Sequence, residues 1–232
     1  MMFTFELLPA RKGDCFLLHF GTPDEPGLVL IDGGPKSVYR PFLKPRLEQI
    51  KQSRHLTADD PLPVDMVMVS HIDDDHIHGL LDLTTEEKIA LEARQPRLLN
   101  VRRLWHNSFD TLVDQESDDA LASMKSQFGA AAVSGNGLSD EVRGEIEAGS
   151  SEPHDVVNST LQVLASVEQG FRLRRDAEGL SYSRNPEFDG GLIIAQEKGG
   201  TVSIREDLTF TVVGPMVHEI TALQKKHIAW LK

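Results

Sequence analysis

The sequence predicts a mixed α/β fold, and three observations support this prediction. The N-terminal part contains three short apolar segments separated by turn residues. A segment with helical spacing follows, and a largely apolar strand then leads directly into a loop rich in histidine and aspartate. Strand patterns interleaved with helical patterns are typical of proteins whose sheets are covered by helices.

The N-terminal segment predicts a β-hairpin. Residues 3–8 and 15–20 alternate apolar and polar side chains, and residues 10–14 form the turn with Gly13. A third strand over residues 28–31 ends at Asp32, Gly33 and Gly34. Two glycines directly after a buried strand predict a tight loop in which the backbone closely approaches a site.

Helical spacing continues over residues 37–54, with the apolar side chains on one face. Pro41 and Pro45 interrupt its first half, so we expect the regular helix to start late. Residues 64–69 are apolar except for Asp65 and predict a largely buried strand, which ends at the loop of residues 70–79. Residues 98–105 predict another strand, and His106 follows it.

The composition changes between residue 110 and about residue 200, where Gly, Ser, Ala and acidic residues dominate. This change predicts a helical insertion over residues 110–200 within a single domain of residues 1–232. Helical patterns cover residues 140–148 and 156–171, and residues 192–195 resemble a strand. Strands are expected again over residues 201–204 and 208–213, and a final helix over residues 217–231.

Composition and charge narrow the function classes. Hydrophobic residues make up 40% and charged residues 26% of the chain, which is ordinary for a globular protein. The net charge of −12 disfavours a broad nucleic-acid-binding surface, although it leaves room for a local basic strip. Cys15 is the only cysteine, so no intrachain disulfide can form. With no secretory signal or membrane-spanning segment in the pattern, we expect a cytoplasmic protein without membrane contact.

Residues 71–76 contain two imidazoles and three carboxylates immediately after a buried strand. This mixture of nitrogen and oxygen donors is typical of sites for zinc, manganese or iron. Five ionisable groups at such a position are costly without a cation. The alternative is a solvated acidic turn with incidental histidines. We expect one or two divalent ions here, with zinc as the preferred metal. The side chain of Asp74 is expected to face solvent.

The same residues resemble a known signature. The segment from Val67 to Gly79 is similar to the metallo-β-lactamase motif His-x-His-x-Asp-His-x-x-Gly, with Asp73 in place of the second histidine. The form His-x-Asp-x-Asp-His is typical of the hydrolase domain of DNA-uptake competence proteins and their soluble relatives. Two further segments resemble the opening hairpins of this group: Lys12-Gly13-Asp14-Cys15-Phe16-Leu17-Leu18 and Ile31-Asp32-Gly33-Gly34.

The resemblance implies a fold and a reaction. The fold is an αββα four-layer sandwich. His71 and Asp73 would bind one metal, and Asp75 and His76 the other. A metal-bound hydroxide would attack a carbonyl or a phosphorus, with Asp75 as the catalytic residue that orients the water. The competence-type loop favours a phosphodiester, in a small molecule or a nucleic acid, and thus nuclease-like activity. The alternatives are a lactonase or thioesterase, and a degenerate module with a non-catalytic binding or regulatory role.

Three further residues are candidates for supporting roles. Asp32 would support the loop of residues 70–79, called the metal loop below, by hydrogen bonds. An aspartate before two glycines is also a common turn residue. His78 is expected to be a supporting or surface histidine rather than a ligand. His106 ends a predicted strand and either contacts the site without binding metal or serves as an unconventional ligand.

Complete members of this superfamily add a third histidine, a bridging aspartate and a final histidine, and the sequence offers no matching motifs. Gly214 stands where a histidine ligand would be expected. We therefore expect the N-terminal portion of a longer protein, with the second half of the fold incomplete. The alternative is a natural short form whose site is completed by a partner or by a second copy in a homo-oligomer.

Overall fold

The computed structural model describes residues 2–107, 153–196 and 200–230, together with residues 122, 124–126, 133 and 143. The helix predicted over residues 140–148 therefore lies outside the described residues, except for residue 143. The described part is a mixed α/β structure, as predicted. No described helix combines the length and the apolar character that crossing a bilayer requires.

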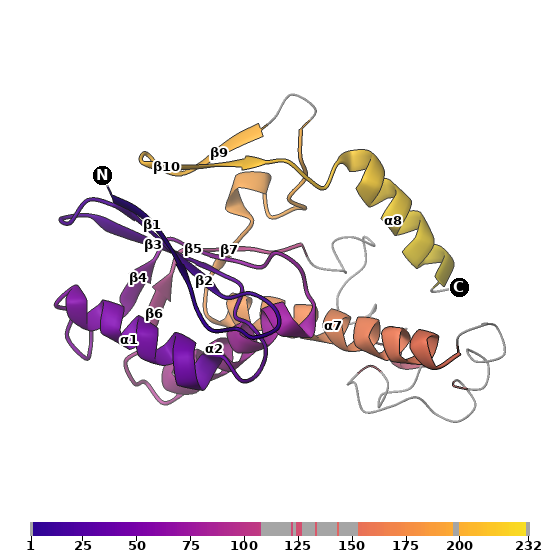
Figure 1. The fold of residues 1–232 in the computed structure, drawn as a ribbon, viewed down its shortest axis with the longest axis horizontal. Coiled ribbons are helices and arrows are strands. Elements are labelled where there is room, and N and C mark those ends of the chain that lie inside the picture. The colour runs from indigo at the N-terminus through magenta and orange to yellow at the C-terminus, as the bar shows by residue number, and fades with distance from the viewer. Residues whose placement is uncertain are drawn as a thin grey trace.

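The main sheet has six strands in the order β1-β2-β3-β5-β7-β8 (Figure 1). The predicted hairpin and third strand are confirmed, because β1 (Met2–Leu7), β2 (Phe16–Gly21) and β3 (Pro26–Ile31) are antiparallel neighbours. Three strands extend the sheet parallel to β3: β5 (Met66–Met68), β7 (Arg103–Trp105) and β8 (Ser183–Arg184). Parallel strands end at the same edge of a sheet, so the residues that follow β3, β5 and β7 are brought together there.

The predicted strands 64–69 and 98–105 are each divided in two. Their first halves, β4 (Leu62–Val64) and β6 (Leu99–Val101), form a separate parallel pair. The breaks fall at Asp65 and Arg102, whose side chains are joined by a 3.3 Å ion pair. Asp65 also accepts a hydrogen bond from the backbone N–H of Leu28 in β3. The charged side chains therefore interrupt the apolar strands at the point where the chain passes from one sheet to the other.

Helices cover one face of the main sheet (Figure 1). The late helix start is confirmed, because one wide turn, η1 (Tyr39–Leu43), precedes α1 (Lys44–Ser53), which has a proline in its first turn. Helix α2 (Asp74–Glu92), which begins within the metal loop, is not among the predicted elements. The helical pattern at residues 156–171 is part of the longer α7 (Pro153–Gly179), whose Leu173 and Ala177 join the core beneath α1 and α2.

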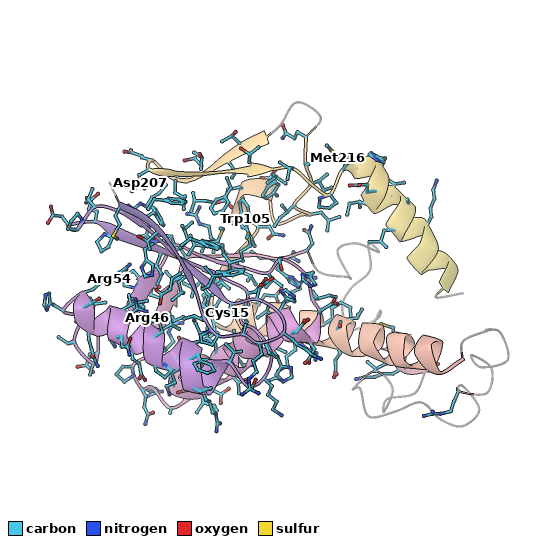
Figure 2. The ribbon with its side chains drawn as sticks, viewed as in Figure 1. Cys15, Arg46, Arg54, Trp105, Asp207 and Met216 are labelled. Atoms are coloured by element: carbon cyan, nitrogen blue, oxygen red, sulfur yellow. The ribbon has the colours of Figure 1, made fainter. Side chains whose placement is uncertain are left out.

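The other face of the sheet packs against β9 (Gly200–Arg205) and β10 (Leu208–Val212), which confirms these two predicted strands. Trp105 lies between the layers, with its ring 5.4 Å from that of Phe188 in the short helix η2 (Pro186–Phe188) and 5.7 Å from that of Phe210 (Figure 2). The final helix is confirmed as α8 (Val217–Trp230). The strand predicted over residues 192–195 is reduced to a single bridge between Ala195 and Met216.

Candidate metal centre

The metal loop lies at the edge of the main sheet where β3 and β5 end, and α2 begins within it. Glycines allow the loop after β3 to pack on the first turns of α2. A Cβ on Gly79 would lie 1.9 Å from the carbonyl oxygen of Gly33, and the N–H of Gly33 donates to the carbonyl of His76 at 2.7 Å. The close backbone approach expected at the Gly33-Gly34 loop is therefore present.

The structure brings the predicted ligands together. Three of them, His71, Asp75 and His76, offer ligand atoms that all lie within 4.8 Å of one another. The two imidazole rings are 3.7 Å apart between centroids. Asp75 Oδ1 lies 3.8 Å from His76 Nε2, and Asp73 Oδ2 lies 3.7 Å from His71 Nε2. Each imidazole thus has its Nε2 near one of the predicted carboxylates.

Asp32 contacts the imidazole of His76 directly and that of His71 through Ser70. It is buried, and its Oδ2 lies 3.0 Å from His76 Nδ1. The same carboxylate accepts hydrogen bonds from the backbone N–H and the hydroxyl of Ser70, at 2.8 and 2.5 Å. The Ser70 hydroxyl proton is thereby used, so its oxygen accepts from His71 Nδ1 at 2.9 Å. With Nδ1 as the donor in both rings, both Nε2 atoms are free to bind metal.

Asp73 is the N-cap residue of α2, but its side chain makes no capping hydrogen bond. An N-cap aspartate usually accepts a hydrogen bond from the first turn of its helix. The start of α2 carries a partial positive charge of about half a unit, which cannot balance the three carboxylates of residues 73–75. The excess negative charge and the paired imidazoles therefore fit a divalent cation such as zinc.

Asp74, His78 and Cys15 lie near the cluster, but none of them belongs to a group of clustered donors among the described residues. Asp74 is exposed, as expected, and its Oδ1 lies 2.9 Å from both His78 Nδ1 and Gln169 Nε2. His78 is thus engaged by Asp74, and Gln169 connects α7 to the metal loop. The Cys15 thiol is buried, and burial together with the charge of Asp32 raises its pKa to about 12. This thiol is protonated at neutral pH and is no nucleophile.

His106 follows β7 and is buried beside the loop, near Ile72 and Gly170. Its backbone N–H and carbonyl are both held by the side-chain amide of Asn185. Neither ring nitrogen makes a well-formed hydrogen bond within the described part of the chain. Burial lowers the pKa of His106 to about 4, although the nearby Gly170 backbone slightly favours the protonated form. The imidazole is therefore neutral, and it belongs to neither group of clustered metal donors among the described residues.

Two residues at this edge were not among the sequence candidates. Ser70 links Asp32 to His71, and Asp14 brings a carboxylate oxygen to within 3.8 Å of His76 Nδ1. The position of Ser70 directly before His71 is a local signal that could have indicated its role. Asp14 has no comparable signal, because its approach to His76 depends on how the first hairpin packs.

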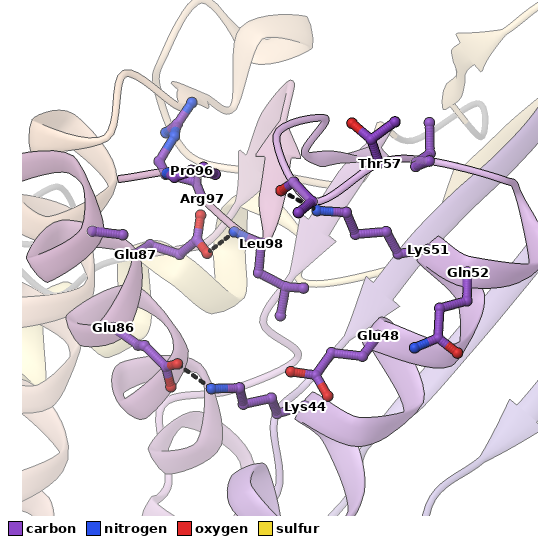
Figure 3. A pocket seen from close by; sticks show the side chains of 13 residues that line it. Lys44, Glu48, Lys51, Gln52, Thr57, Glu86, Glu87, Pro96, Arg97 and Leu98 are labelled. Atoms are coloured by element: carbon purple, nitrogen blue, oxygen red, sulfur yellow. Dashed lines mark hydrogen bonds and ion pairs between the residues drawn. The ribbon is translucent and has the colours of Figure 1, made fainter. Parts of the chain in front are cut away.

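A hollow of about 470 Å³ lies against the C-terminal half of α2, away from the metal loop (Figure 3). Several of its charged side chains have partners within the protein. Lys44 pairs with Glu86, and Lys51 donates to the carbonyl of Ala58. The carboxylate of Glu87 accepts hydrogen bonds from the backbone N–H groups of Leu98 and Leu99. These contacts give the side chains a structural role, and no residue that lines this hollow belongs to a group of clustered metal donors among the described residues.

Comparison with known proteins agrees with the geometry. The family model of the metallo-β-lactamase superfamily matches residues 8–158, which include every clustered donor described above. No curated protein and no solved structure matches the chain. The match covers more than half of the 232 residues and includes the metal loop, the loop after β3, and the turn and second strand of the first hairpin. The chain therefore belongs to the metallo-β-lactamase superfamily.

Proposed function

We propose that this domain is a metal-dependent hydrolase whose centre holds one or two divalent ions, zinc first, with a phosphodiester as substrate. The observation that supports it most is the cluster of His71, Asp75 and His76, with both Nε2 atoms turned toward carboxylates. Membership of the superfamily supports a hydrolase. The phosphodiester preference rests on Asp73, the substitution that resembles the competence-type loop.

A divalent ion in such a centre supplies a Lewis acid and makes water a nucleophile at neutral pH. His71 and Asp73 would hold one ion, and Asp75 and His76 a second. Asp75 would also orient the attacking water by accepting its hydrogen bond. Asp32 and Ser70 accept hydrogen bonds from the two Nδ1 atoms and so orient the rings with Nε2 as the nitrogen that would bind metal.

We also propose a cellular location, a way in which the metal site is completed, and a class of substrate. We infer a cytoplasmic location from the single buried cysteine, which suits a reducing compartment. Within the part of the chain that the structure describes, the clustered donors are few for a pair of ions, so a second copy or a partner is proposed to complete the coordination. Substrates are proposed to be small molecules or nucleic acids that carry the phosphodiester.

The test compares hydrolysis of bis(4-nitrophenyl) phosphate and 4-nitrophenyl acetate, each with Zn²⁺ and with Mn²⁺. We expect cleavage of the phosphodiester that falls about 100-fold or more in Asp75→Asn, because this substitution removes a ligand and the water acceptor together. Asp59→Asn is the control, because it removes one charge from an exposed position before β4. Cleavage of the acetate alone would redirect the proposal to acyl esters. Metal binding without any turnover would identify a non-catalytic module.

A further inference from the structure

The turn between β1 and β2 lies against the first turn of α2. Gly13 has a positive φ of 80°, and a Cβ at this residue would lie 1.8 Å from the carbonyl oxygen of Asp75. Only glycine fits so close a backbone contact. The contact fixes the position of the next residue, Asp14, relative to the metal cluster.

Asp14 approaches one specific side of the His76 ring. Its Oδ2 lies 3.8 Å from Nδ1, the nitrogen that also faces Asp32 at 3.0 Å. Ligand atoms of Asp14, Asp32 and His76 all lie within 4.8 Å of one another. The other nitrogen, Nε2, faces Asp75. Two carboxylates, those of Asp14 and Asp32, therefore lie beside Nδ1, and the carboxylate of Asp75 lies beside Nε2.

The two carboxylates differ in distance and exposure. Asp32 is 1% exposed and within hydrogen-bond distance, so it takes the single proton of Nδ1. The Asp14 side chain is 49% exposed and lies too far away for a hydrogen bond. Its effect on His76 is therefore electrostatic, and solvent weakens this effect without removing it.

We propose that Asp14 is a positioning residue of the metal centre, which acts through His76 and strengthens metal binding at Nε2. A negative charge beside Nδ1–H makes the opposite nitrogen a better electron donor to a metal, as carboxylates behind ligating histidines do. The inference rests on the proposed function, since it requires that the cluster binds metal. It adds a residue from the first hairpin, far from the metal loop in sequence.

The test measures Zn²⁺ affinity by competition with a chromophoric chelator in wild type, Asp14→Asn, Asp14→Glu and Asp59→Asn. We expect Asp14→Asn to bind Zn²⁺ about tenfold more weakly, at the lower end of the effect of outer carboxylates. The number of ions bound, the visible spectrum of the Co²⁺ form and the melting temperature of the metal-free protein should stay unchanged. Asp14→Glu keeps the charge and should retain most of the affinity, and Asp59→Asn should match wild type.

Several results would overturn the inference. Equal affinity in Asp14→Asn and wild type would show that the carboxylate has no influence on the centre. An equal loss in Asp59→Asn would show only a general effect of net charge. A lost ion or a shifted Co²⁺ spectrum in Asp14→Asn would make Asp14 a ligand rather than a positioning residue. A wild-type protein that binds no Zn²⁺ would instead overturn the proposed function, and this inference with it.

Discussion

The two ends of α2 use carboxylates in opposite ways. Near its C-terminal end, Glu86 pairs with Lys44, and the buried Glu87 accepts two backbone hydrogen bonds. At its N-terminal end, Asp73 and Asp75 lie near imidazole nitrogens at distances of 3.7 and 3.8 Å, which are too long for hydrogen bonds. Carboxylates with protein donors stabilise the fold, whereas those without donors can receive a cation.

The largest expected effect comes from the backbone contact that joins the site to the sheet. In Gly79→Ala the new Cβ would collide with the Gly33 carbonyl, which is backbone and cannot rotate away. We expect a loss of about 3 kcal/mol in the free energy of unfolding, measured by urea denaturation, together with weaker metal binding. Gly179→Ala is the matched control, because open space surrounds this helical glycine. The comparison fails if the two variants are equally stable.

Asp32→Asn tests the orienting carboxylate at the N-terminal end. Asparagine keeps the shape and tolerates the positive φ of 56°. The carboxylate accepts two hydrogen bonds from Ser70 and one from His76 with its two oxygens, whereas an amide has only one accepting oxygen and no charge. Either the Ser70 backbone N–H or the Nδ1 proton of His76 therefore loses its acceptor. We expect Zn²⁺ affinity, measured by chelator competition, to fall about 10- to 100-fold. Unchanged affinity would mean that Asp32 serves only as a turn residue before Gly33 and Gly34.

Glu87→Gln tests the structural carboxylate at the other end. Burial raises the pKa of Glu87 above 4.5, although two backbone N–H donors oppose this. The folded state then holds the proton more tightly than the unfolded state, so this contribution is present below pH 4.5 and is lost as the pH rises through the raised pKa. Glutamine cannot titrate. We therefore expect Glu87→Gln to cost about 1 kcal/mol at low pH and less at pH 7.5.

Urea denaturation at pH 4.5 and pH 7.5, with a chelator present, measures this difference between wild type and Glu87→Gln. Zn²⁺ affinity at neutral pH should stay unchanged, because Glu87 lies at the end of α2 away from the metal loop. A stability difference that grows with pH would contradict the assignment. A lower Zn²⁺ affinity in Glu87→Gln would show that the carboxylates at both ends of α2 influence metal binding.

Local sequence patterns predict β1 to β3, β9, β10 and the late start of α1, and they mark the metal loop as the candidate site. Apolar alternation identifies β1 to β3, and the positions of Pro41 and Pro45 identify the late helix start. Ligands adjacent in sequence are necessarily close in space, so the loop itself marks the candidate site. Helix α2 is harder to predict, because polar residues from the metal loop form its first turn and disturb the amphipathic pattern.

Long-range partners cannot be found in this way. Asp14 and His76 are brought together by the packing of Gly13 on Asp75, and nothing local in the sequence encodes that contact. The breaks at Asp65 and Arg102 also depend on a pairing between two strands. Each strand looks continuous by itself, because one or two charged residues in an apolar run are compatible with a single strand.

The cluster at the start of α2 is expected to hold a divalent cation. Dialysis of the purified chain against Zn²⁺ or Mn²⁺, followed by elemental analysis, measures the metal that it binds. We expect at least one tightly bound ion per chain, and its loss in a variant that carries His76→Ala together with Asp75→Asn. A wild-type chain that retains no stoichiometric metal under either condition would contradict this expectation.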